Sequence, residues 1–142
     1  MKTILAMTLA TLASLAAGDS RAAQDSLLQG TWTLTAADRI LPGGERAQDY
    51  GKSPKGRLIV DSQGRYSLQI FKAERPSFAS GDKAHGTAGE YESAALGSST
   101  HYGTVVADPE KHILTFKLEG ASFPNWEGTT QKREYTLKDG NA

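Results

Sequence analysis

The chain has 142 residues, which is the length of one ordinary domain. Its 16 Lys and Arg residues balance 16 Asp and Glu residues, and this zero net charge argues against a nucleic-acid-binding protein and against an acidic disordered tail. The absence of cysteine excludes disulfides, thiolate metal sites, a cysteine nucleophile and a lipoprotein anchor.

The N-terminal segment has the pattern of a secretory signal peptide. Lys2 gives the charged start, an apolar run extends from Ile4 to Ala17, and Ser20 and Ala22 form a small-x-small cleavage site. The run is shorter than the roughly 20 residues of a transmembrane helix; a buried N-terminal helix is the alternative. We predict a signal peptide over residues 1–22 and a mature domain over residues 23–142. The protein is then secreted, or periplasmic in a Gram-negative host, with no integral membrane segment after cleavage.

Hydrophobicity along the mature chain alternates with a period of two, which is typical of half-buried strands. In the first strand Trp32 and Leu34 alternate with threonines, and the turn Asp61–Gly64 predicts a hairpin between the two strands that flank it. The expected strands are residues 31–36, 56–61, 65–72, 100–107, 113–119 and 128–138, with a doubtful one at 45–50. Short strands linked by hairpins predict a single all-β domain, an antiparallel up-and-down β-barrel.

The longest connection of the chain, residues 73–99, has little regularity. It is rich in Gly, Ser and Pro, and only residues 90–96 suggest a helical turn or two. Long connections in compact domains are often lids, so this one is either a functional lid or a surface loop.

Several short motifs, taken together and in this order, resemble one known family. The chain has Gly30-Thr31-Trp32 at the first strand, then Arg75-Pro76, and then the run Pro-Asn-Trp-x-Gly-Thr-x-Gln-x-Arg at residues 124–133. This pattern resembles the bacterial and fungal lipocalin-like domain family over about residues 30–140. The resemblance implies a lipocalin-like barrel with an internal cavity, and it implies little about ligand or reaction.

Two features depart from that family. Many relatives carry a His pair where this chain has Phe116 and Lys117, so a site built on those histidines is in doubt. Relatives also continue into one more strand after the last turn, so we expect the barrel to lack its last strand. A barrel that is one strand short exposes two edges. Either the gene product is truncated, or another segment or a partner chain fills the gap, and a homodimer through open edge strands is one form of that closure.

Arg133 is the most informative charged residue, because it shares one strand face with Gln131 and Tyr135. If that face points inward, the guanidinium lies in the cavity and needs a partner, such as Glu90 or a ligand carboxylate. The alternative is a structural Arg that closes the barrel base beneath Trp32, as in lipocalins. The predicted ligand-binding residues are Arg75, Tyr102, Trp126, Gln131, Arg133 and Tyr135. For Arg75 the alternative is a solvated turn residue.

His101 is a candidate for acid–base catalysis, because imidazole titrates near neutral pH. Glu90 is the second candidate. A surface or barrel-rim histidine is the alternative for His101. The three histidines lack metal-ligand spacing, and no nucleotide-binding or serine-hydrolase motif is present, so we expect no metal and no cofactor.

Three functions remain open from the sequence. The first is an exported protein that binds a small, mainly apolar molecule in its barrel, with no nucleic-acid partner. The second is a lipocalin-fold enzyme of the isomerase, cyclase or hydratase type that acts on a small hydrophobic substrate. The third is an interaction protein whose open strand edge pairs with another chain.

Overall fold

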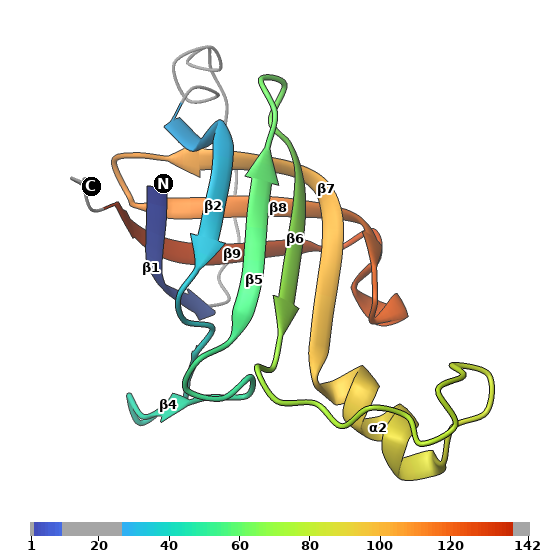
Figure 1. Ribbon diagram of the computed structural model, residues 1–142. Coiled ribbons are helices and arrows are strands. Elements are labelled where there is room, and N and C mark those ends of the chain that lie inside the picture. The colour runs from blue at the N-terminus through green and yellow to red at the C-terminus, as the bar shows by residue number, and fades with distance from the viewer. Residues whose placement is uncertain (1, 10–26, 138–142) are drawn as a thin grey trace.

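The strands of the computed structural model curl into a barrel (Figure 1). The structure describes residues 2–9 and 27–137. Around the barrel the order is β1 (Lys2–Leu9), β2 (Gly30–Leu34), β5 (Lys55–Val60), β6 (Arg65–Phe71), β7 (Ser98–Asp108), β8 (Ile113–Ala121) and β9 (Thr130–Leu137). From β2 to β9 each strand is antiparallel to the next, which confirms the predicted all-β, up-and-down architecture.

β1 lies between the two edges of this curled antiparallel sheet. It runs parallel to β2, with Lys2 opposite Trp32, and antiparallel to β9, with Leu9 opposite Arg133. Of the two closures expected from the sequence, another segment of the same chain therefore fills the gap. That segment is the beginning of the predicted signal peptide, so the pairing belongs to the uncleaved chain. The predicted cleavage site lies outside the described residues, and the signal peptide stays a prediction.

The hairpins form where the sequence predicts them. The turn between β5 and β6 is held by Asp61, whose carboxylate accepts hydrogen bonds from the Gln63 and Arg65 amides at 2.9 Å, and Gly64 supplies a φ of 73°. The doubtful strand at residues 45–50 is much shorter than expected: only β4 (Arg46–Ala47) forms, paired with β3 (Arg39–Ile40) in a separate two-stranded sheet.

The long connection contains one helix, α2 (Ala88–Leu96), slightly longer than the predicted turns. Thr87 and Glu90 cap its N-terminus reciprocally, which explains why the helix begins here. The loop and α2 extend away from one end of the barrel (Figure 1), and none of the residues of α2 is buried.

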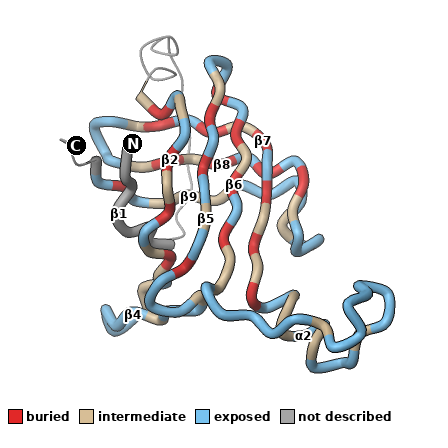
Figure 2. Tube along the Cα trace, viewed as in Figure 1, coloured by how far each residue is buried: buried red, intermediate tan, exposed pale blue. Residues whose placement is uncertain are grey.

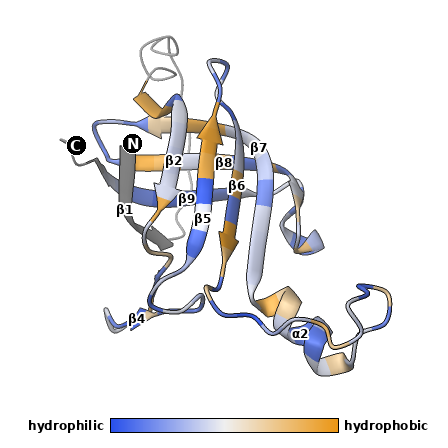
Figure 3. Cartoon of the chain, viewed as in Figure 1, coloured by the Kyte–Doolittle hydropathy of each residue, from blue (hydrophilic) through white to orange (hydrophobic). Residues whose placement is uncertain are grey.

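The core occupies the barrel interior, because alternate residues of each strand point inward. Figure 2 shows buried and exposed positions alternating along β5, β6, β7 and β8. Phe116, Leu68 and Leu114 are the largest fully buried side chains, and the Trp32 indole donates to the Leu28 carbonyl at 2.7 Å. Figure 3 shows that β9 is mostly hydrophilic, whereas part of β5 is apolar.

The bulge between β7 and β8 requires a glycine at position 103. The register shifts between Tyr102 and Gly103, and a Cβ on Gly103 would overlap the Lys117 carbonyl oxygen. We expect Gly103→Ala to lower the free energy of unfolding by about 1–3 kcal/mol in urea denaturation. Gly43→Ala is the matched control, because Gly43 faces open space. Equal stability of the two variants would contradict this role for the bulge.

Candidate functional site

Polar side chains from three strands meet inside the barrel around the ring of Phe116. Tyr66 comes from β6, His101 from β7, and Gln131 and Arg133 from β9. The Phe116 centroid lies 4.8 Å from the Tyr66 centroid, 6.0 Å from the His101 centroid and 5.9 Å from the Arg133 guanidinium carbon. We call these five residues the inner polar cluster.

A hydrogen bond of 2.7 Å joins the Tyr66 hydroxyl to Nδ1 of His101. His101 is only 3% exposed and Tyr66 only 4%. Nε2 of His101 is also buried, and it has no hydrogen-bond partner among the described residues. Because almost all buried polar groups in proteins are hydrogen-bonded, this nitrogen needs an explanation.

Burial and charge together keep His101 neutral. Burial, and secondarily the positive charge of Arg133, lower the pKa of His101 to about 4. Burial also raises the pKa of the Tyr66 phenol, with Arg133 acting in the opposite direction. At neutral pH the pair is therefore an uncharged imidazole and an uncharged phenol.

Arg133 brings a positive charge into this apolar surrounding. Its Nη2 donates to Oε1 of Gln131 at 2.9 Å. Burial lowers the pKa of Arg133, and the nearby hydroxyls of Tyr66 and Tyr50 oppose that shift. Gln131 lies opposite Phe116 and Arg133 opposite Leu114 in the β8–β9 ladder, so the predicted face of β9 does point inward.

The structure gathers some of the predicted site residues and separates others. Trp126, in the 3-10 helix η1 (Pro124–Trp126), meets the His101 ring edge-on at 6.4 Å. Tyr135 is buried on the same face of β9 but packs against His112, with centroids 5.8 Å apart.

Tyr102 and Arg75 are not part of the inner polar cluster. Tyr102 follows His101 in β7, points to the outer face and is 56% exposed, with its ring over Gly120. Arg75 stacks on the Phe71 ring with its guanidinium carbon 4.7 Å from the centroid, and it is exposed. Neither residue therefore lies where a ligand in the barrel interior would contact it.

Glu90 is engaged elsewhere as well, in an ordered arm formed by the long loop and α2. Its carboxylate accepts from the Ala79 amide at 2.8 Å and the Thr87 amide at 2.7 Å, and these bonds lower its pKa. It is a helix cap, and the pair with Arg133 considered from the sequence does not form.

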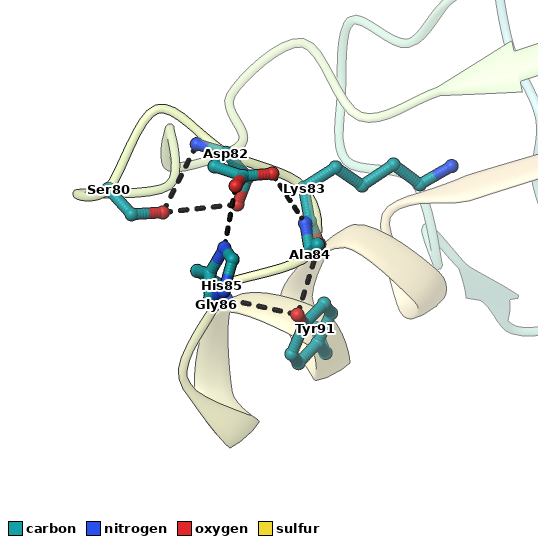
Figure 4. Close-up of polar contacts among 7 residues, drawn as sticks. All are labelled: Ser80, Asp82, Lys83, Ala84, His85, Gly86 and Tyr91. Carbon is teal, nitrogen blue, oxygen red and sulfur yellow. Dashed lines mark hydrogen bonds and ion pairs between the residues drawn. The ribbon is translucent and has the colours of Figure 1, made fainter.

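Further polar contacts hold the tip of this arm (Figure 4). Asp82 pairs with His85 at 2.6 Å, and the Tyr91 hydroxyl donates to the Lys83 carbonyl at 3.0 Å. These groups are exposed, so they order the arm and form no enclosed site. Among the described residues, no three His, Asp or Glu side chains gather as metal ligands would.

Tyr66 and Phe116 are cluster members that the sequence analysis did not select. Both residues had been assigned to strands, where aromatic side chains are usually part of the hydrophobic core. The alternation of β6 could have predicted that Tyr66 faces the interior, because it lies on the same face as Leu68. Leu68 in turn pairs with His101 across the β6–β7 ladder. Phe116, at the position where the resemblance implied a histidine, is fully buried, and β7 supplies an imidazole beside it.

The comparisons with known proteins agree with this architecture. A family model described as a lipocalin-like domain matches residues 29–142, so the chain belongs to the lipocalin-like domain family. No curated protein and no solved structure matches the chain significantly. In the described part of the chain, no helix has the length and apolar character needed to cross a bilayer.

The hydrogen bond between Tyr66 and His101 should be measurable in the stability of the fold. We expect Tyr66→Phe to lower the free energy of unfolding by about 1–3 kcal/mol, because it leaves Nδ1 of His101 buried without its partner. Tyr102→Phe removes an exposed hydroxyl and should change stability by less than about 0.5 kcal/mol. Urea denaturation compares the two, and an unaffected Tyr66→Phe would contradict the assignment.

The low pKa of His101 predicts a pH dependence of stability. The folded state takes up its proton only near pH 4, whereas an unfolded histidine does so near 6.5. Between these values the unfolded state binds more protons, so stability falls as the pH falls through this window, by up to about 3 kcal/mol. The His101→Gln variant should lose less stability over the same window in urea denaturation. Parallel decreases in the two proteins would contradict a neutral buried imidazole.

Proposed function

We propose that this protein is an exported lipocalin-type protein that binds a small, mainly apolar molecule inside its barrel. The observation that carries the proposal is Nε2 of His101, a polar atom buried within the barrel with no hydrogen-bond partner among the described residues. Ligand pockets combine apolar walls with a few placed polar groups, and the inner polar cluster has that composition. Membership in the lipocalin-like domain family supports the same function.

A lipocalin-fold enzyme of the isomerase, cyclase or hydratase type is the second candidate. The observation that favours it is the bond between His101 and Tyr66, since a neighbouring group that orients an imidazole is common in acid–base sites. Its low pKa makes His101 a weak base at neutral pH, which favours binding. Conversion of a bound compound that His101→Gln abolishes while keeping affinity would favour the enzyme.

Binding inside the barrel can be tested with an environment-sensitive apolar dye, N-phenylnaphthylamine. Ser99 is buried and lies two residues before His101, on the same inner face of β7, whereas Thr100 points to the other face. We expect Ser99→Leu to weaken dye affinity at least fivefold, because the larger side chain takes up interior space. Thr100→Leu should leave the affinity unchanged. An equal affinity in both variants, or no dye binding by the wild-type protein, would count against an interior ligand site.

Export rests on the predicted signal peptide and has its own test. Removal of residues 1–22 would take away β1, and the edges of β2 and β9 would lose the strand between them. We expect the intact mass of protein recovered from outside the cytoplasm of a Gram-negative host to correspond to residues 23–142. Full-length protein that stays in the cytoplasm would contradict export and would make β1 a permanent barrel strand. Sedimentation of the cleaved form would show whether its open edges pair as a homodimer.

A further inference from the structure

The hydrogen bond from Tyr66 determines which hydrogen-bonding role is left for His101. No second acceptor for the Tyr66 hydroxyl is found among the described residues, so this hydroxyl donates its proton to Nδ1. A neutral imidazole that accepts at Nδ1 carries its own proton on Nε2. The buried nitrogen is therefore an N–H donor, and the group that it fits is an acceptor.

Arg133 brings a positive charge close to the Phe116 ring that the imidazole of His101 also faces. Its guanidinium carbon lies 5.9 Å from the Phe116 centroid, and the His101 ring lies 6.0 Å from it. Arg133 has further contacts besides Gln131, and its charge still acts on both His101 and Tyr66. Neither Asp nor Glu occurs among the buried residues of the described chain, and the acidic charge that acts on Tyr66 is that of Glu119, which is exposed.

We propose that the ligand is an apolar molecule with a carboxylate, which accepts a hydrogen bond from Nε2–H of His101 and faces the guanidinium of Arg133. This inference rests on the proposed binding function and specifies the chemical class of its ligand. The carboxylate supplies an acceptor for the buried Nε2–H donor of His101 and brings a negative charge close to the guanidinium of Arg133. The apolar part of the ligand lies against the aliphatic and aromatic residues of the barrel wall.

Calorimetric titration with octanoate, octanol and octylamine tests the ligand class, because these probes share one apolar chain. The full chain and any cleaved form are both titrated. We expect octanoate to bind at least tenfold more tightly than octanol, since hydrogen bonds to charged groups are the stronger ones, and octylamine to bind least. Equal affinity for octanoate and octanol would overturn the carboxylate and leave apolar binding intact. Failure of all three to bind would overturn both proposals.

Variants locate the carboxylate within the barrel. Arg133→Gln should weaken octanoate at least tenfold and octanol less than threefold. Arg75→Gln, which removes an exposed guanidinium from the outside, should leave both affinities unchanged. Equal losses for octanoate and octanol in a folded Arg133→Gln protein would overturn the contact.

A measurement on the wild-type protein guards against a variant that fails to fold. Octanoate should shift the ¹⁵N and ¹H resonances of Nε2–H in His101, while the ring signals of the exposed His85 stay in place. An unchanged His101 resonance at saturating octanoate would overturn the proposal.

Discussion

The constraint on which this structure depends is the alternation of side chains along strands that curve around a common interior. Every second residue of β6, β7, β8 and β9 faces a space that the apolar wall shields from water. Polar groups placed on that face must find partners within it. The hydrogen bond from Tyr66 to His101, and that from Arg133 to Gln131, are the visible results of this requirement.

The inner polar cluster follows from the same constraint. Three strands contribute polar side chains around Phe116, with the imidazole 6.0 Å and the guanidinium carbon 5.9 Å from the Phe116 centroid. Once Tyr66 has donated to Nδ1, the imidazole has a single donor left, in a place that water does not readily reach. A barrel that only needed stability would be better served by apolar residues here, because half-satisfied polar networks are costly. This cost is the physical reason to connect the cluster with a ligand.

Local patterns predicted most of the fold and part of the site. The Asp61–Gly64 turn and the shared strand face of Gln131, Arg133 and Tyr135 followed from alternation and turn chemistry, both of which act between near neighbours. Tyr102 was assigned to the ligand site although burial alternates without a break along β7, where positions 101 and 103 are buried and 102 is exposed. Neighbours in a strand point to opposite sides, so His101 inside requires Tyr102 outside.

Contacts between distant segments were beyond sequence reasoning. Tyr66 and His101 are 35 positions apart, and their bond depends on the register between β6 and β7. Glu90 was predicted as a partner for Arg133 or an acid–base group, but the folded loop brings the Ala79 amide to it across 11 positions. The sequence predicted that some segment closes the barrel, but it did not identify β1. The pattern of residues 2–9 is that of the start of a signal peptide, so these residues were not considered as a strand.

Native mass spectrometry of protein purified without denaturation tests the central claim, an interior ligand site, most directly. The account predicts a protein with one discrete additional mass that is released on unfolding and reduced in the Ser99→Leu variant but not in Thr100→Leu. A wild-type protein that carries no additional mass, even after incubation with octanoate, would contradict it.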